Sequence, residues 1–461
     1  MFKISNHYVS RITFFLLLVE TLILVASVYL GATIRFYPDP FKLDNTFLSA
    51  CAFALVMLFS MSALGMYQFN FVEDLRNTFL RLMPSFALGL GIITLVFYLA
   101  PDLYFGRGIL GFVIIIAASG TLLTRVLFFK SAQSKLLESR IIFLGNGTLA
   151  RECRDLVTGN TGYHKFNIIG FIPMPDEECC IPVADILSAN ESLASMAKKH
   201  NVSEIVVSVQ NRRGRAFPIQ DLLECKLNGI KVTSAETFFE REACQIRVDS
   251  LQPSWLVFGG GFDQSFLRIS IKKVFDLFAS VTLFIVTLPV MLITALCIYL
   301  EDRAPIFYQQ ERVGKDGQTF MVLKFRSMRN DAEKNGSPQW ASADDPRTTR
   351  VGRIIRKLRI DELPQIMNVI KGDMSFVGPR PERPFFVKQL NDEIPYYNVR
   401  HSIKPGITGL AQVRYQYGAS VDDAVQKLQY DLYYVKNNSL FLDVLILIET
   451  IQVVLFGKGS R

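Results

Sequence analysis

Long uninterrupted apolar runs occupy the first third of the chain, and their lengths predict membrane helices. Each of four runs is near the ~20 residues that a helix needs to cross a bilayer. The runs are Phe14–Ile34, Phe47–Met66, Leu82–Leu99 and Ile109–Phe129. Four such runs with short connections favour a membrane bundle over the buried helices of a soluble core. Glu20 is the only charge in the first run, and we expect it to face the bundle interior.

Basic residues beside these runs predict their orientation. Lys3 and Arg11 precede the first run, while Lys130, Lys135 and Arg140 follow the fourth. Lysine and arginine concentrate in the loops that stay on the cytoplasmic side. We therefore expect the N-terminus, and everything after the fourth run, to lie in the cytoplasm.

From about residue 140 the pattern changes to short apolar runs that alternate with helical periodicity. This predicts a Rossmann-like α/β domain, with strands at Arg140–Leu144, Phe166–Ile172 and Glu204–Val209. A turn containing Gly145 and Gly147 fits GxGxxA, which can hold a pyrophosphate at a helix N-terminus. The acidic residue expected after the second strand is not evident, so a regulatory or self-association role is favoured over nucleotide binding.

A fifth apolar segment lies within 271–300 and contains Pro289 near its middle. Proline removes a backbone hydrogen bond and clashes with the preceding turn, so we expect it to break or kink the helix. Basic residues flank both ends, including Arg268, Lys272 and Arg303. Positive charge on both sides favours a re-entrant hairpin that enters and leaves one leaflet. The alternative is a kinked helix that spans the bilayer.

Two short strands are predicted next, at Pro305–Gly314 and Phe320–Met328, with Lys324 on a face that is available to anions. In Arg347–Arg359, apolar residues recur at i, i+3, i+4 and i+7, and basic residues occupy the other faces. Such a basic amphipathic helix beside a membrane hairpin is expected to lie among the lipid headgroups. Aromatic residues that could stack on bases are not found near these arginines, which argues against nucleic-acid binding.

Composition narrows the chemistry further. The chain has 461 residues, of which 50% are hydrophobic, and a net charge of +8, which suits anionic lipid or anionic small substrates. Its seven cysteines form no CxxC pair, which indicates reduced thiols that face the cytoplasm. Its four histidines lie far apart in the sequence, which argues against a zinc site or a His-based triad.

An acidic pair, Asp361 and Glu362, directly follows the basic run, and a Gly-Pro-Arg-Pro turn follows at 378–381. Adjacent carboxylates among fixed cations suit phosphoryl chemistry. The acids can hold a divalent metal or attack phosphorus, while guanidinium groups bind phosphate oxygens. For an isolated pair, however, a solvated charged helix is the favoured interpretation.

A resemblance to one family runs nearly unbroken from about Lys272 to Phe456, and four motifs carry it. They are RVGKDGQTFMVLKFRSM, DDPRTTRVGRIIRKLRIDELPQIMNVIKGDMSFVGPRPE, PGITGLAQV and KLQYDLYYVKNNSLFLDVLIL. They resemble the bacterial sugar transferases, the polyprenyl-phosphate hexose-1-phosphate transferases that start exopolysaccharide, capsule and O-antigen chains. The four spans and the Rossmann-like domain resemble the long form of that family. The GGGFD junction is similar to members linked to the PEP-CTERM/exosortase system.

The resemblance implies a reaction in the bacterial inner membrane. A UDP-hexose gives hexose-1-phosphate to undecaprenyl phosphate and releases UMP, and Mg²⁺ is required. By the same resemblance Asp361 is the nucleophile that forms a phosphosugar-enzyme intermediate. Glu362 is the neighbouring acid, and the metal belongs at Asp361, alone or with Glu362.

The resemblance also implies roles for four further residues. Arg380 matches the family's phosphate-binding arginine, and Lys324 and Arg356 match other basic positions of the active site. Pro289 matches the proline that breaks the re-entrant helix. A homodimer is compatible with the long form of the family.

Together these expectations define three parts. They are a four-helix transmembrane region at 1–135, a Rossmann-like cytoplasmic domain at 136–255, and a small monotopic α/β catalytic domain at 256–461 with its re-entrant helix. A nucleotide-sugar dehydratase or epimerase is disfavoured, because Tyr163 has no lysine four residues on. A non-enzymatic membrane scaffold would leave the dense C-terminal motifs unexplained.

Overall fold

The chain folds as two compact units in the computed structural model. One unit combines Met1–Phe2 with Tyr8–Ala243, and the other combines Lys3–His7 with Cys244–Arg461. The structure describes residues 2–36, 46–67, 75–133, 138–159, 166–175, 177–187, 191–209, 212, 217–249, 260–262, 265–303, 305–329, 347–415, 418 and 420–456. The expected domain boundaries at 135/136 and 255/256 lie outside these residues.

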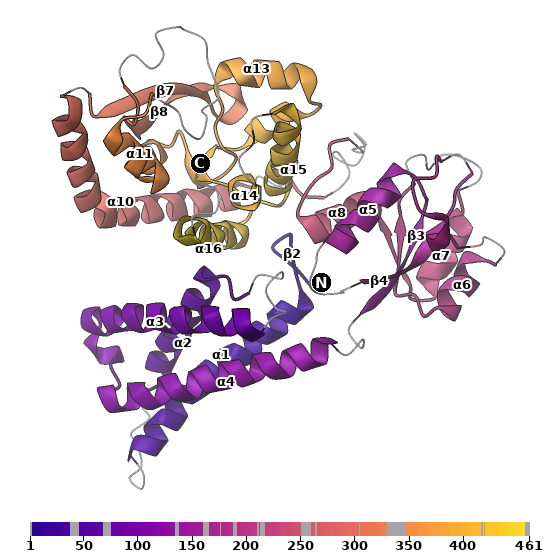
Figure 1. The fold of residues 1–461 in the computed structure, drawn as a ribbon, viewed down its shortest axis with the longest axis horizontal. Helices are drawn as coiled ribbons and strands as arrows, with labels where there is room; N and C mark the ends of the chain where they lie inside the picture. Colours follow the sequence, from indigo (N-terminus) through magenta and orange to yellow (C-terminus); the bar gives the residue numbers. More distant parts are fainter. Residues whose placement is uncertain are drawn as a thin grey trace. The chain divides into compact units, whose positions relative to one another are not determined.

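Four apolar helices form a bundle in the first unit (Figure 1). They are α1 (Arg11–Phe36), α2 (Thr46–Ala63), α3 (Leu75–Leu99) and α4 (Arg107–Gln133). The four predicted runs are confirmed as helices, although α3 begins seven residues before Leu82 (82 − 75). Together with α10 in the second unit, these helices are long and apolar enough to cross a membrane.

The bundle buries one ion pair inside its apolar core. Arg125 of α4 donates from Nε to Oε1 of Glu20 on α1 at 2.7 Å, and both side chains are almost fully buried. Tyr67 donates its hydroxyl to the other oxygen of Glu20, and Arg125 also donates to the carbonyl of Met66. The expectation that Glu20 faces the bundle interior is therefore confirmed, and its partner is Arg125.

A four-stranded parallel sheet follows in the same unit, in the order β4-β3-β5-β6. Its strands are β3 (Ser139–Leu144), β4 (Phe166–Ile172), β5 (Glu204–Val207) and β6 (Lys231–Ser234). The sheet confirms the three predicted strands and adds β6. A two-stranded sheet, β1 (Phe2–Ile4) with β2 (His7–Val9), lies at the N-terminus.

Helices cover both faces of the parallel sheet (Figure 1). Ile142 and Leu144 of β3 pack with α6 (Leu193–Lys199) and α7 (Ile219–Leu227), while Phe143 packs with α5 and α8 on the other face. Helix α5 spans Thr148–Gly159, and α8 spans Ala235–Ala243. Alternate residues of the strand therefore enter two separate cores, as the period of a β-strand requires.

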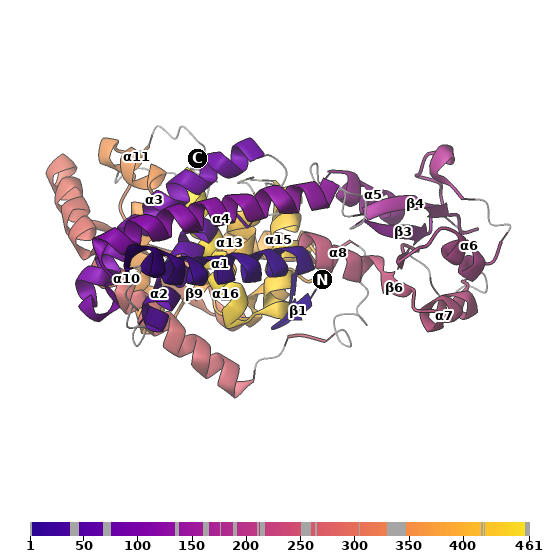
Figure 2. The same cartoon turned by 90° about the horizontal axis from the view of Figure 1, so that it is seen from below.

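The second unit begins with the long helix α10 (Phe266–Asp302). The break expected at Pro289 does not interrupt the helix, which runs through this residue and changes direction along its length (Figures 1 and 2). A proline lacks the N–H that would bond to the preceding turn, so a bend within a continuous helix is its ordinary effect. Many apolar side chains of α10 are exposed, including Phe278, Ile285 and Leu292.

The remaining elements of this unit form a small α/β domain. The antiparallel strands β7 (Phe307–Val313) and β8 (Thr319–Phe325) confirm the predicted strand pair, and β9 (Ser375–Val377) lies parallel to β10 (Gly406–Thr408). The helices are α11 (Arg350–Lys357), α12 (Ile366–Lys371), α13 (Pro384–Glu393), α14 (Leu410–Arg414), α15 (Val421–Asn437) and α16 (Leu440–Phe456). Residues from α13, α15 and α16 fill the main core, among them Val387, Tyr433 and Ile446.

The buried pair in the bundle allows a stability test. Replacing Arg125 with Met leaves Glu20 buried without its cation, so we expect a loss of roughly 3 to 5 kcal/mol in the free energy of unfolding. The double variant Glu20→Gln/Arg125→Met removes both charges and keeps the amide within reach of Tyr67. We expect it to regain most of that loss in detergent unfolding experiments. Equal stability of the single variant and the wild type would contradict this account.

Candidate active site

The acidic pair lies on a short 3-10 turn that follows the basic helix. Helix α11 begins after Thr349, whose hydroxyl accepts from the Gly352 amide at 2.9 Å, and it ends at Lys357. The predicted amphipathic helix over Arg347–Arg359 is therefore too long. Arg359 has a left-handed backbone with φ of 59°, which stops the helix and leads into η6 (Ile360–Gln365).

Apolar contacts with α10 hold this turn in place. Met291 and Ile298 of α10 pack in one cluster with Ile355 of α11. Ile360 and Leu363, which flank the acidic pair in sequence, pack against the same cluster. The second half of α10 thus supports the backbone that carries both carboxylates.

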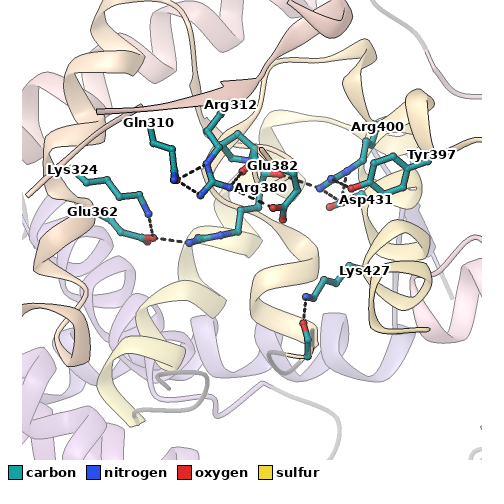
Figure 3. Close-up of polar contacts among 12 residues, drawn as sticks. Gln310, Arg312, Lys324, Glu362, Arg380, Glu382, Tyr397, Arg400, Lys427 and Asp431 are labelled. Carbon is teal, nitrogen blue, oxygen red and sulfur yellow. Dashed lines mark hydrogen bonds and ion pairs between the residues drawn. The ribbon is translucent and has the colours of Figure 1, made fainter. Parts of the chain in front are cut away.

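Glu362 is the point at which three cations meet. Its Oε1 accepts from Lys324 Nζ at 2.9 Å and from Arg380 Nη2 at 2.8 Å (Figure 3). Its Oε2 lies 3.6 Å from Nη1 of Arg359. The structure therefore brings together Lys324, Glu362 and Arg380, which are distant in sequence, and adds Arg359, which the sequence analysis missed.

The cations decide the ionisation of Glu362. Burial alone would raise the pKa of this carboxyl group, but the charges of Arg380, Lys324 and Arg359 outweigh burial. They hold the pKa well below its usual range, so Glu362 stays ionised near neutral pH. A permanently charged carboxylate with both oxygens engaged suits the positioning of cations.

Asp361 has the opposite environment. It is partly buried and forms no hydrogen bond or ion pair with any residue that the structure describes. Burial, followed by the negative charge of Glu362, raises the pKa of Asp361 to about 6, against the influence of Lys324, Arg380 and Arg356. A carboxylate that is partly desolvated and lacks a partner is available to attack an electrophile.

Arg356 influences Asp361 through its positive charge. Its Nη1 donates to the hydroxyl of Thr348 at 3.2 Å, and its positive charge lowers the pKa of Asp361. It makes no ion pair with Glu362 among the described contacts. Of the three predicted basic residues, Lys324 and Arg380 contact the acidic pair, and Arg356 contributes through charge alone.

The turn that carries Arg380 follows β9 and packs closely against the loop around β10. Gly378 donates its amide to the carbonyl of Thr408 at 2.9 Å. A side chain on Gly378 would overlap the carbonyl of Lys404, and one on Gly406 would overlap the amide of Gly378. Glycine at both positions lets the two backbones approach, and this approach sets the place from which Arg380 reaches Glu362.

Helix α10 is also joined to β9 by polar contacts. Asp276 accepts from the hydroxyl of Ser375 at 2.8 Å and from the amide of Phe376 at 3.1 Å. Lys272 donates to the buried carboxylate of Asp443 on α16 at 2.8 Å. The first half of the helix, before Pro289, is therefore fixed to the strand that leads to Arg380.

The carboxylates of the site suit Mg²⁺ as an ion shared with the substrate rather than as one held by protein side chains alone. The described residues contain no group of three or more His, Cys, Asp or Glu side chains that could hold a metal ion. Both oxygens of Glu362 face cations, whereas the carboxylate of Asp361 has no hydrogen-bond or ion-pair partner in the part of the chain that the structure describes. Magnesium is commonly held by one or two carboxylates together with substrate phosphates and water. These residues fit that arrangement, with Asp361 as the protein ligand.

The glycine turn of the first unit is filled by the protein itself. Gly145 has φ of 116°, and the amides of Asn146 and Gly147 donate to Oε2 of Glu177 at 3.0 and 3.3 Å. These are the amides that would otherwise face an anion at the start of α5. In this structure a carboxylate of the same domain occupies that position.

Two buried residues near the site were missed by the sequence analysis. Arg400, in the 3-10 turn η7 (Tyr397–Ser402), donates to the carbonyl of Arg380 and pairs with Asp431 of α15. Neither belongs to a local pattern that marks a functional residue, because their contact joins positions 31 residues apart.

The raised pKa of Asp361 predicts how pH affects stability. Its value is 3.8 in the unfolded chain and about 6 in the folded protein, so ionisation destabilises the fold as pH rises from about 4 to 6. We therefore expect Asp361→Asn to be more stable than wild type by about 3 kcal/mol at pH 8 and to lose this advantage near pH 4. Thermal unfolding without divalent metal measures the difference, and a pH-independent difference would contradict it.

Comparison with known proteins identifies the second unit. Residues 267–457 match the family described as bacterial sugar transferase. The chain is 45% identical over 240 residues to the UDP-N-acetylgalactosamine-undecaprenyl-phosphate N-acetylgalactosaminephosphotransferase of Aeromonas hydrophila, covering 52% of this chain and 56% of the relative. It is 41% identical over 194 residues to the undecaprenyl-phosphate glucose phosphotransferase of Komagataeibacter xylinus, covering 41% of this chain and 36% of the relative.

A shorter relative is matched over its whole length. The exopolysaccharide production protein PSS of Rhizobium leguminosarum bv. phaseoli is 40% identical over 200 residues, which cover 42% of this chain and 100% of the relative. The match therefore spans about half, or less, of the two longer relatives and all of this shorter one. The chain belongs to the bacterial sugar transferase family.

Proposed function

We propose that this protein is a membrane phosphoglycosyl transferase. It moves hexose-1-phosphate from a UDP-hexose to undecaprenyl phosphate, releases UMP, and so begins the synthesis of an exopolysaccharide or capsule repeat unit. The names of the relatives support undecaprenyl phosphate as the acceptor and a sugar phosphate as the transferred group. The observation that carries the proposal is the contrast between two adjacent carboxylates: both oxygens of Glu362 contact cations, whereas Asp361 contacts no polar partner within the described ranges.

Asp361 is the proposed nucleophile. Its carboxylate has no partner among the described residues, whereas Glu362 is held by Lys324 and Arg380. A nucleophile must be free to approach phosphorus, and a positioning group must keep its contacts throughout the reaction. Two carboxylates whose environments push their pKa values apart are typical of such a division of roles.

The proposed reaction has two displacements at one phosphorus. An oxygen of Asp361 attacks the β-phosphorus of the UDP-hexose, and the bond from that phosphorus to the bridging oxygen breaks. UMP leaves with the bridging oxygen, and an acyl phosphate bearing the sugar remains on the enzyme. An oxygen of undecaprenyl phosphate then attacks the same phosphorus, which releases the Asp361 carboxylate and forms a lipid diphosphate-linked hexose.

Cations beside the acids supply the charge that this chemistry needs. Arg380 and Lys324 lie at the paired carboxylate, where they can bind the phosphate oxygens of the donor. Arg356 adds positive charge near Asp361. A Mg²⁺ ion held by Asp361 and the donor diphosphate would offset the charge of the departing UMP.

Asp361→Asn tests the nucleophile. We expect loss of UMP release from UDP-hexose by at least about a thousandfold, because an amide cannot form the acyl phosphate. The measurement is UMP production by the full chain in membranes with Mg²⁺ and undecaprenyl phosphate. Asp316→Asn is a matched control, because Asp316 is exposed and its left-handed φ of 54° suits asparagine. The nucleophile assignment fails if the Asp361 variant keeps activity similar to that of this control.

We further propose that α10 is re-entrant and that the two soluble domains, the Rossmann-like and the catalytic domain, face the cytoplasm from the bacterial inner membrane. Basic residues flank both of its ends, and exposed apolar side chains cover much of its length. Lys272 near its start is tied to Asp443 of α16, and Glu301 near its end accepts from the amides of Arg350 and Val351. A helix with both ends bound to the same small domain is more simply accommodated on one side of a bilayer.

Cysteine labelling tests this topology. In a variant whose seven native cysteines are replaced by serine, new cysteines at Ser265 and Arg303 mark the two ends of α10. We expect an impermeant maleimide to label both from the cytoplasmic face. A cysteine at Asp102, between α3 and α4, should react only from the opposite face. Labelling of the two α10 positions from opposite faces would show a spanning helix.

The Rossmann-like domain is proposed to regulate or to mediate self-association, including a homodimer, rather than to catalyse. Glu177 occupies the amides of Asn146 and Gly147, which supports a structural use of the glycine turn. The division into a transmembrane region, this domain and a catalytic domain stands as part of the same proposal. The link to the PEP-CTERM/exosortase system also remains a proposal.

A further inference from the structure

The turn from Pro379 to Glu382 is fixed by a donor at each of its four carbonyl groups. Two donors are backbone amides and two are arginine side chains. The pairs are Gly406 N with Pro379 O at 3.0 Å, Arg400 Nη2 with Arg380 O at 3.0 Å, Arg312 Nη1 with Pro381 O at 3.1 Å, and Val313 N with Glu382 O at 2.9 Å. The residue that reaches Glu362 is thus held by its own backbone carbonyl.

Arg400, the donor to that carbonyl, is a buried charge that makes four hydrogen bonds. Its side chain is only 5% exposed. Asp431 Oδ2 accepts from Nη2 at 2.8 Å and from Nε at 3.1 Å, and the Tyr397 hydroxyl accepts from Nη1 at 2.7 Å (Figure 3). The two protons on Nη2 therefore serve two acceptors, Asp431 and the carbonyl of Arg380.

The planar shape of the guanidinium group makes this arrangement directional. The donors of an arginine lie in one rigid plane. Asp431 binds Nε and one N–H of Nη2, and Tyr397 binds Nη1. These contacts fix the plane of the group and so set the direction in which the second N–H of Nη2 points, toward the carbonyl of Arg380. Lysine could keep a charge beside Asp431, but its single nitrogen cannot reproduce this geometry.

We propose that Arg400, anchored by Asp431, is a positioning residue for donor binding. It fixes the backbone of Arg380 and thereby aims that guanidinium at the diphosphate of the sugar nucleotide. Arg400 does not touch the substrate and acts only through Arg380. This inference rests on the proposed function insofar as Arg380 is taken to bind phosphate.

A purely structural ion pair would give different results. Loss of a buried pair destabilises the whole domain, and its effect on ligand binding would be independent of Arg380. A positioning role predicts that ligand affinity depends on Arg400 only while Arg380 is present. The two roles are therefore separated by combining the variants.

The test measures UDP binding to the full chain in lipid nanodiscs by calorimetry, with Mg²⁺ present. The variants are Arg400→Lys, Arg380→Ala and their combination, each accompanied by a thermal unfolding curve. Arg414→Gln is the matched control, because Arg414 also forms an ion pair in this unit, with Glu449, and makes none of the bonds to the turn.

We expect Arg400→Lys to weaken UDP binding about three- to tenfold, the equivalent of one lost hydrogen bond, with an unfolding temperature close to that of wild type. Arg380→Ala should weaken binding more, and the combined variant should bind no more weakly than Arg380→Ala. Arg414→Gln should bind as wild type does.

Three results would overturn the proposal. Arg400→Lys could bind UDP with wild-type affinity, or its effect could persist in full on the Arg380→Ala background. The wild-type protein could also bind no UDP, which removes the phosphate site itself. A wild-type protein that binds UDP but transfers no sugar phosphate would instead refute the proposed function, and the affinities would still decide the role of Arg400.

Discussion

The buried carboxylate of Glu362 organises the charged residues of the site. One of its oxygens lies within 3 Å of both Lys324 and Arg380, which come from β8 and from the turn after β9. Without that negative charge, the two cations would repel each other in a partly desolvated region. The same cations keep the pKa of Glu362 low, so its carboxylate stays ionised at neutral pH and continues to attract them.

The neighbouring Asp361 depends on this arrangement. The cations that pair with Glu362 form no ion pair with Asp361 among the described contacts, and the charge of Glu362 adds to burial in raising the pKa of Asp361. Adjacent acids thus acquire different pKa values from position alone, which is the basis of the proposed division into an anchor, Glu362, and a nucleophile, Asp361. Because burial and the charge of Glu362 disfavour the ionised form of Asp361, its ionisation opposes folding, a cost that is common at functional sites.

Much of the fold follows from local patterns that the sequence displays. Long apolar runs predicted the helices α1 to α4, and short apolar runs predicted the strands β3, β4 and β5. Strand β6 was missed because Lys231–Ser234 is short and carries one large apolar residue, Val232. The helix predicted over Arg347–Arg359 ended early, because hydrophobic periodicity does not reveal the left-handed turn at Arg359.

The site itself was predictable only in part. The acids and most of their cations lie in dense motifs, so a family resemblance could identify them. Two features of the site are contacts between positions far apart in the sequence. They are the pairing of Glu362 with Lys324 and the bond from Arg400 to the carbonyl of Arg380. The position of Arg380 also depends on the close approach of two glycine-containing loops, at Gly378 and Gly406, which no local pattern specifies.

The most direct test of the central claim is mass spectrometry of the protein after brief exposure to a UDP-hexose without a lipid acceptor. The account predicts a hexose phosphate on the peptide that contains Asp361, formed together with an equal amount of UMP. Addition of undecaprenyl phosphate should then remove the modification. A modification located on Glu362, or full transfer activity with no modified peptide at any time, would contradict the account.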